Sequence, residues 1–212
     1  MAPTDRFVPR FAAEPPQERL PHGRWAHRLS DAFYAACERI DAQGEDLGEP
    51  GDILFYPDRT YAGRTYVPAT ALTSTELELF GFIAYTPAGE GGAEPGDLVA
   101  TADFTAETAE RNPQWRLDLC DEAIGRWRGE EGRTATVELV WGRPLVAGGA
   151  LVTAELADLA VDQCTLVEER FTLVAPDDYR SDLLEILLWD RRGAELARES
   201  LYEPDDEEPA AG

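Results

Sequence analysis

The sequence contains no lysine, because all 19 of its basic residues are arginine. A P-loop requires a lysine on the nucleotide phosphates, and a Schiff base requires a primary amine on the protein. P-loop nucleotide hydrolases and enzymes that hold pyridoxal phosphate on a lysine are therefore excluded. Strong codon bias is one explanation of the absence, and selection against lysine modification is another.

Histidine, serine and cysteine are also scarce. His22 and His27 are the only histidines, and no His/Cys cluster has the spacing of a zinc site. None of the four serines lies in a G-x-S-x-G motif, which excludes a serine hydrolase of that type. The three cysteines are odd in number and lie far apart in the sequence. This pattern favours reduced thiols in a cytosolic protein over a set of disulfides. We expect neither a metal nor a cofactor.

Long apolar runs are missing. None approaches the ~18 residues that a membrane-spanning helix needs, and the opening MAPTDRFVPRF lacks the apolar segment of a secretory signal. The sequence therefore predicts a cytoplasmic protein without membrane contacts. Its 212 residues are enough to bury an ordinary hydrophobic core.

Acidic residues dominate the charge. The chain has 42 acidic residues and a formal net charge of −23. Residues 1–30 contain five arginines and three acidic residues, so the excess of carboxylates belongs to the remainder of the chain. Such a body repels the phosphates of nucleic acids, and we expect no direct nucleic-acid binding. Its field instead favours basic partners.

The chain divides into four parts by composition and periodicity. Residues 1–22 are rich in Pro and Arg and read as an extended arm. Residues 23–44 have apolar residues at three- and four-residue steps, which predicts an amphipathic helix ending at Gly44. Residues 52–203 form a β-rich body, and the acidic tail 204–212 is expected to be disordered.

The body is expected to be a β-sandwich or a barrel of about nine to eleven strands, so that the fold is mainly β (α+β). Runs of β-branched and aromatic residues mark nine of these strands: 52–56, 78–86, 97–105, 114–119, 124–129, 133–142, 170–175, 182–190 and 195–202. The last two form a hairpin with Arg192-Gly193 as its tight turn. Residues 152–166 fit either a strand or a helix, and their high helix propensity favours a second helix.

A shift of the sequence by 85 positions suggests an internal repeat. The shift places Leu54, Ala62, Gly63, Val67 and Ala69 on Leu139, Ala147, Gly148, Val152 and Ala154. The body would then consist of two related halves, 52–119 and 137–203. Since Ala and Gly are common in this chain, coincidence is the alternative.

The tripeptide Arg-Thr-Tyr occurs twice, at 59–61 and 64–66, with Ala62 and Gly63 between. If these two residues are a turn, Tyr61 pairs with Arg64 and Arg59 with Tyr66, giving two cross-strand cation–π contacts. If the turn is at Pro57-Asp58 instead, residues 61–67 are one strand. Beside a purely structural role, Arg64, Tyr66 and Tyr61 are candidates for binding a small ligand.

One family resemblance concerns the second half of the body. The segment AGGALVTAELADLAVDQ, a following strand that ends in VAP, and the hairpin LLWDRRGAELARES resemble the helix, strand and hairpin of a hotdog-fold acyl-thioester enzyme. The resemblance covers about 60 residues, and this half is one strand short of the family's fold. It implies Glu155 or Asp158 as the catalytic carboxylate, with Gly148 and Gly149 at the start of the helix.

These observations support two hypotheses about function. The first is a non-enzymatic binding or assembly protein, whose acidic body engages a basic partner or the Arg-rich arm of another subunit. The second is a small-molecule-binding or acyl-thioester-processing domain, with thioesterase- or dehydratase-like chemistry.

Overall fold

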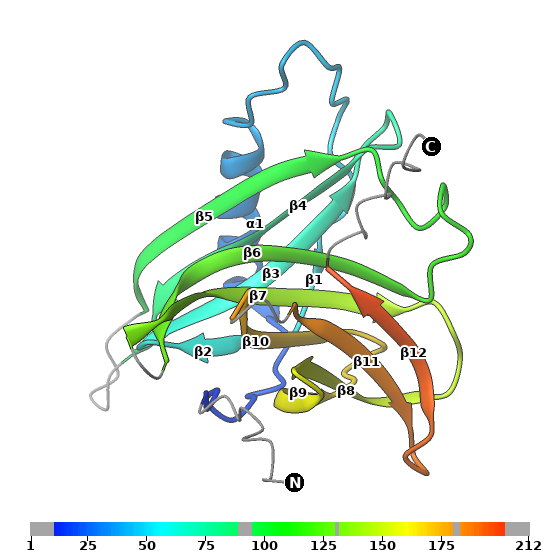
Figure 1. Cartoon of the computed structure of the whole chain (residues 1–212). Coiled ribbons are helices and arrows are strands. Elements are labelled where there is room, and N and C mark those ends of the chain that lie inside the picture. Colours follow the sequence, from blue (N-terminus) through cyan, green and yellow to red (C-terminus); the bar gives the residue numbers. More distant parts are fainter. Residues whose placement is uncertain (1–10, 89–94, 130–131, 180–182, 202–212) are drawn as a thin grey trace, which may run out of the picture.

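The protein is mainly β, as the sequence predicts. The computed structural model describes residues 11–88, 95–129, 132–179 and 183–201. Within these ranges, 12 strands form three antiparallel sheets and one helix packs against them (Figure 1). No helix in the described ranges combines the length and the apolar character needed to cross a bilayer. The acidic tail lies outside the described residues.

The five-stranded sheet carries the helix on its outer face. Its strands are β1 (Leu54–Phe55), β2 (Arg59–Tyr61), β3 (Arg64–Leu72), β4 (Glu78–Thr86) and β5 (Gly96–Thr105). Helix α1 (Gly23–Cys37) buries Leu29 and Phe33 against Val67 and Ile83 of the sheet. The predicted apolar stripe of the helix is therefore the stripe that contacts the sheet.

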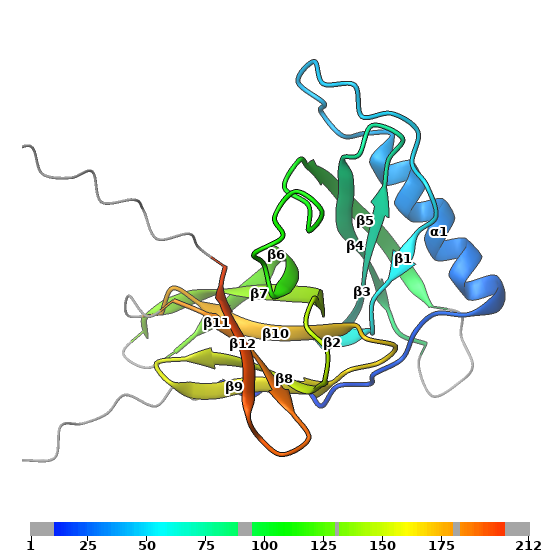
Figure 2. The same cartoon turned by 90° about the vertical axis from the view of Figure 1, so that its right-hand side faces the viewer.

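Two further sheets lie below the first. The three-stranded sheet has the order β10 (Phe171–Asp177), β7 (Thr134–Pro144), β6 (Leu117–Arg128). The four-stranded sheet has the order β12 (Glu195–Ser200), β11 (Glu185–Asp190), β8 (Gly149–Leu156), β9 (Leu159–Thr165). The three-stranded sheet is the middle layer, because Trp141 on one face packs toward the five-stranded sheet and Val140 on the other packs toward the four-stranded sheet (Figure 2).

Among the described strands, no ladder joins β10 to β9, and carboxylate side chains accept backbone N–H groups at these two edges instead. The backbone N–H of Val174 in β10 donates to Oδ2 of Asp162 in β9, at 2.8 Å. The N–H of Thr165 at the end of β9 donates to Oε1 of Glu18 in the N-terminal arm, at 2.9 Å. Edge N–H groups that would otherwise be unpaired are satisfied in this way.

The predicted second helix is wrong. Residues 152–166 belong to the hairpin of β8 and β9, whose turn residues Ala157 and Asp158 both have positive φ, at 54° and 59°. Val152, Ala154 and Leu156 alternate into the core and are fully buried. This two-residue period places them on one face of a strand, and burial on that face overrides helix propensity.

Two predicted boundaries also change. The N-terminal helix ends at Cys37 and not at Gly44. Just after this end, the Arg39 side chain donates to the carbonyl of Ala35 in the last turn of the helix. The strands expected at 114–119 and 124–129 are one strand, β6, with an irregular register between Ala123 and Gly125. The hairpin of β11 and β12 is confirmed, and Asp190 Oδ1 accepts two backbone N–H groups across its turn. The turn itself differs from the predicted Arg192-Gly193, because the Gly193 N–H donates to the Asp190 carbonyl and Arg191 and Arg192 are the central residues.

The strand pairing does not repeat between the two proposed halves. Both Ala62-Gly63 and Ala147-Gly148 form turns that lead into a strand, β3 and β8 respectively. In the first half, β3, β4 and β5 are neighbours in one sheet. In the second, β8 lies between β9 and β11, and β10 belongs to another sheet. The shared sequence positions therefore do not correspond to a shared topology.

Candidate functional site

The two Arg-Thr-Tyr segments form a hairpin with the first of the two predicted registers. Tyr61 pairs with Arg64 and Arg59 with Tyr66. Ala62 and Gly63 have φ values of 50° and 78°, as both central residues of a type I′ turn do. The alternative with the turn at Pro57-Asp58 is wrong.

The side chains of this hairpin contact other partners than the expected ones. Arg64 donates from Nη2 to the carbonyl of Asp97, at 2.8 Å. Tyr66 is buried and packs edge-to-face on Phe82, with ring centroids 5.4 Å apart. Tyr61 lies against Phe11 of the arm. The three candidate ligand-binding residues therefore point to different neighbours.

Arg59 is a core residue, which the sequence does not reveal. Its side chain is fully buried, and Nη2 lies 2.5 Å from Oδ2 of Asp162 in β9. Among the described residues, its Nε and Nη1 have no hydrogen-bond partner. The pair links the five-stranded sheet to the four-stranded sheet, and a pair of this kind is costly to break from one side.

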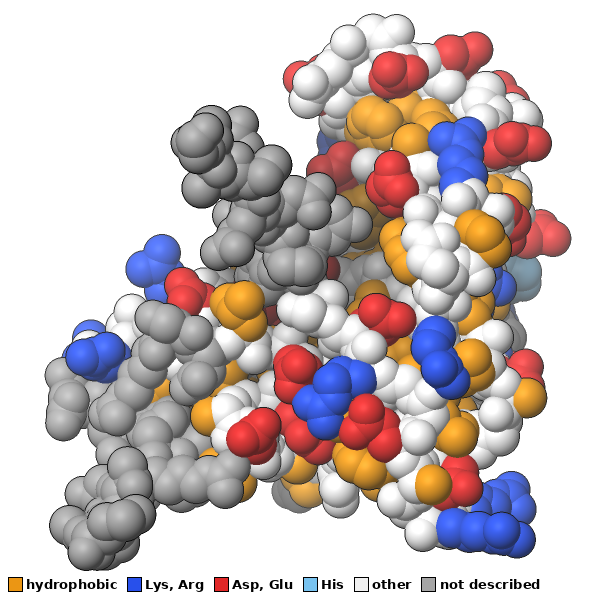
Figure 3. Space-filling view, turned by 45° about the vertical axis from the view of Figure 1, so that its right-hand side comes forward, with side chains coloured by type: hydrophobic (Ala, Val, Ile, Leu, Met, Phe, Trp, Pro, Cys, Tyr) orange, Lys and Arg blue, Asp and Glu red, His pale blue; other side chains and the backbone are white. Residues whose placement is uncertain are grey.

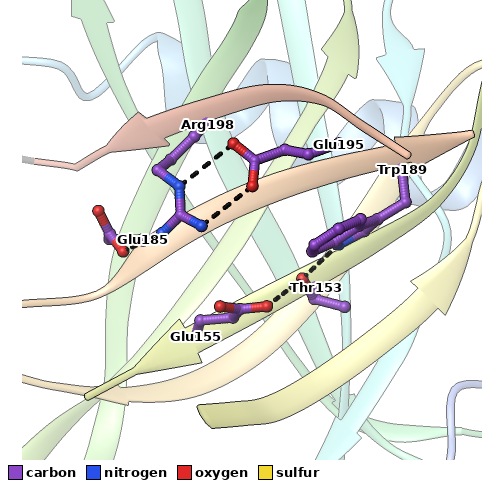
Figure 4. A network of polar contacts seen from close by, with 6 residues as sticks. All are labelled: Thr153, Glu155, Glu185, Trp189, Glu195 and Arg198. Carbon is purple, nitrogen blue, oxygen red and sulfur yellow. Dashed lines mark hydrogen bonds and ion pairs between the residues drawn. The ribbon is translucent and has the colours of Figure 1, made fainter. Parts of the chain in front are cut away.

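The carboxylates implied by the hotdog resemblance lie on strands and turns. Glu155, in β8, accepts from Thr153 Oγ1 at 3.2 Å, and Trp189 Nε1 donates to the same hydroxyl at 2.8 Å (Figure 4). Asp158 occupies the exposed turn after it. Gly149 begins a strand and not a helix. The helix whose amides would hold a thioester oxygen does not exist, so the resemblance does not carry a catalytic site.

The three cysteines are free thiols with suppressed acidity. Burial raises the pKa of Cys37 to about 11 and that of Cys164 to about 12. The pKa of Cys120 is raised well above its ordinary value, first by burial and then by neighbouring carboxylates. A thiol needs to ionise to act as a nucleophile, so burial disfavours the reactive thiolate form at all three positions.

An acidic pocket of about 770 Å³ lies beside the end of β5. Its lining includes the acidic residues Glu45, Asp46 and Asp103 and the apolar residues Leu77 and Phe104. The one arginine in its lining, Arg111, donates from Nη1 to the carbonyl of Ala106 at 3.1 Å. We refer to this space as the acidic pocket. A lining that combines carboxylates with apolar side chains suits a long cationic side chain.

Four acidic residues lie where the five-stranded and three-stranded sheets approach each other, and Asp103 of the acidic pocket is one of them. This acidic seam consists of Glu78 on β4, Asp103 on β5, and Asp118 and Glu122 on β6. Thr101 Oγ1 of β5 donates to Glu122 Oε2 at 3.0 Å, so the two edge strands are in contact here. Arg143 Nε donates to Asp118 Oδ2 at 2.8 Å and balances one of these charges.

Burial and mutual repulsion make the seam electrostatically unfavourable. The pKa of Glu78 is raised to about 7, first by burial and then by Asp118. The pKa of Glu122 is also raised, by burial and by Asp103 and Asp121, against the hydrogen bond from Thr101. A cation placed among these carboxylates would relieve the repulsion and favour their ionised forms. Figure 3 shows one face of the molecule, on which acidic side chains are spread widely with fewer arginines among them.

The arrangement of these acids is not that of a metal centre. Within the part of the chain that the structure describes, no three His, Cys, Asp or Glu side chains are arranged so that they could hold a metal ion. Comparison with known proteins gave no match, whether to a family model, to a curated protein or to a solved structure.

Proposed function

We propose that this protein is a non-enzymatic binding protein, and that its acidic pocket receives a basic segment of a partner protein. The observation that carries the proposal is the composition of the pocket, whose lining contains three acidic residues together with Leu77 and Phe104. The net charge of −23 supports it, because the field of the whole molecule attracts cationic partners before contact. A cytoplasmic location remains a prediction.

The pocket offers partners for both the apolar stem and the charged head of an arginine or lysine side chain. The methylene stem of such a side chain can pack on Leu77 and Phe104, while its charged head meets Asp46 and Asp103. Asp46 Oδ1 accepts the N–H of Gly48 at 3.1 Å, and Asp103 Oδ1 accepts that of Phe104 at 2.8 Å. Both carboxylates are thus oriented by the backbone before a partner arrives, which lowers the entropic cost of binding.

The test measures the affinity of a fluorescein-labelled nona-arginine peptide by fluorescence anisotropy at 50 and 300 mM salt. The double variant Asp46→Asn/Asp103→Asn removes two charges from the pocket, and each asparagine can still accept its backbone N–H. The matched control Asp31→Asn/Asp178→Asn removes two charges from exposed sites, one on α1 and one directly after β10.

We expect binding that weakens with salt, and a Kd about 3- to 10-fold higher for the pocket variant than for the control, because an exposed ion pair contributes ~0.2–1 kcal/mol. Equal affinities of the two variants would show that only net charge matters, and would contradict a defined site.

The partner can also be another copy of this chain, through its Arg-rich arm. Residues 11–22 of the arm contact their own body: Gln17 accepts from Thr60, and Arg19 and Asp58 exchange hydrogen bonds. Residues 1–10, with Arg6 and Arg10, lie outside the described residues. Native mass spectrometry of the full chain and of a variant lacking residues 1–10, at low and moderate salt, tests this version. Unchanged oligomeric state in all four samples would refute it.

A further inference from the structure

A second cavity, of about 460 Å³, lies at the start of α1, at the end of the helix opposite to the acidic pocket. The chain just before the helix forms one wall and the helix-facing side of the five-stranded sheet forms another. Its apolar lining comes from Leu20, Trp25 and Val67, and Tyr85 adds a second aromatic ring. This volume falls in the range of sites for small organic ligands.

The aromatic wall of the cavity is held in place by its neighbours. The rings of Trp25 and Tyr85 meet edge-to-face, with centroids 5.0 Å apart and an interplanar angle of 84°. The guanidinium carbon of Arg28 lies 5.3 Å from the centroid of the Trp25 ring. Both contacts are favourable in the absence of a ligand and orient the two rings.

Asp58, Arg19 and His22 are the acidic and basic residues among those that line the same cavity. Asp58, between β1 and β2, accepts the backbone N–H of Arg19 on Oδ1 at 3.0 Å and donates its own N–H to the Arg19 carbonyl at 2.9 Å. Burial raises the pKa of Asp58, and the charge of Arg19 opposes this effect. Within the described ranges, no ion pair joins these two side chains, although the charge of Arg19 acts on Asp58. Both charges are therefore close together and still able to contact a ligand.

We propose that this cavity binds a free α-amino acid with an apolar or aromatic side chain. The ammonium group of the ligand would contact Asp58, its carboxylate would contact Arg19, and its side chain would pack on Trp25, Tyr85 and Val67. A zwitterion satisfies both charged residues at once. A simple amine would face the charge of Arg19 without compensation, and a simple acid would face that of Asp58.

The experiment is isothermal titration calorimetry of the full chain with L-phenylalanine, L-leucine and L-tryptophan, each up to 10 mM. Phenethylamine and phenylacetate serve as comparison ligands, since each lacks one of the two charges of phenylalanine. Asp58→Asn keeps the acceptor for the Arg19 N–H and removes the charge. Asp41→Asn is the matched control, because Asp41 also accepts a nearby backbone N–H, that of Gln43, and lies beyond the other end of α1.

We expect at least one amino acid to bind, with a Kd at least 10-fold lower than those of both comparison ligands. Asp58→Asn should raise that Kd by about 10-fold, and Asp41→Asn should leave it unchanged. The proposal is overturned if none of the three amino acids binds, if phenethylamine or phenylacetate binds as tightly as phenylalanine, or if Asp58→Asn has no effect. These outcomes are independent of the acidic pocket, whose residues are not changed.

Discussion

Replacing Glu138 with glutamine should stabilise the protein at pH 8 and have little effect at pH 4.5. Glu138 lies in β7, is 7% exposed and faces the four-stranded sheet. Its pKa is raised from 4.5 to about 7, first by burial and then by the carboxylates of Asp121, Asp177 and Glu122. The folded protein therefore holds this proton more tightly than the unfolded chain does.

The sign and size of the effect follow from this difference. A raised carboxyl pKa favours folding at low pH, and the stability it contributes is lost as the pH rises from about 4.5 through about 7. The two pKa values differ by an amount that corresponds to about 3 kcal/mol in the free energy of unfolding, as an upper limit. Glutamine has nearly the same shape and cannot ionise, so the variant should gain ~1–3 kcal/mol over the native protein at pH 8.

Urea unfolding followed by tryptophan fluorescence at pH 4.5, 6 and 8 measures this gain directly. Glu38→Gln, at the exposed end of α1, is the control for loss of one negative charge. The reasoning is refuted if Glu138→Gln changes the free energy of unfolding by the same amount at pH 4.5 and pH 8, or if Glu38→Gln reproduces its pH dependence.

Three further substitutions test the packing of the sheets in the same unfolding assay. Arg59→Met should cost ~3–5 kcal/mol, because it leaves Asp162 buried without its charge partner; a loss below 1 kcal/mol would show that the pair is unimportant. Gly142→Ala should destabilise by ~2–4 kcal/mol, since the new Cβ would lie 2.1 Å from a backbone oxygen of β6, whereas Gly96→Ala meets nothing within 4 Å and is its control. Ala62→Asn should stabilise by ~0.5–1 kcal/mol, because asparagine tolerates the positive φ of this turn position better than alanine; a loss of stability would contradict that assignment.

The sequence predicted the strands best where their ends carry strong turn signals. β4 spans the predicted residues 78–86, and the β11–β12 hairpin forms around Gly193, which has a φ of 79°. The helix was equally clear, since Leu29 and Phe33 recur at helical spacing and both are buried. In these elements local propensity and tertiary burial favour the same conformation.

The strands β3, β8 and β9 contain or adjoin residues that usually mark another structure, and none of them is among the nine strand runs that the sequence marked. β3 contains Pro68, which cannot donate to a ladder, but it lies opposite the gap between β1 and β2. The β8–β9 turn consists of Ala157 and Asp158, which are weak signals for a type I′ turn beside a segment of high helix propensity. Whether these segments become strands depends on which of their residues are buried in the core, and local sequence does not specify this.

The sequence predicted the acidic character of the candidate site but not its position in the fold. The excess of acidic residues is plain in the sequence, but the residues of the acidic pocket come from loops and strands that are far apart in the chain, such as Asp46 and Asp103. Arg59 shows the same limit, because its partner Asp162 is 103 residues away. Contacts at such distances depend on the packing of whole sheets, which no local pattern specifies.

The most direct test of the account is hydrogen–deuterium exchange of the full chain with and without nona-arginine. If the acidic pocket is the site for a basic segment, slower exchange should be confined to the peptides that cover residues 43–46, 75–78 and 103–111, and it should be lost in Asp46→Asn/Asp103→Asn. Protection that is spread evenly over the acidic surface, or that persists in this variant, would contradict it.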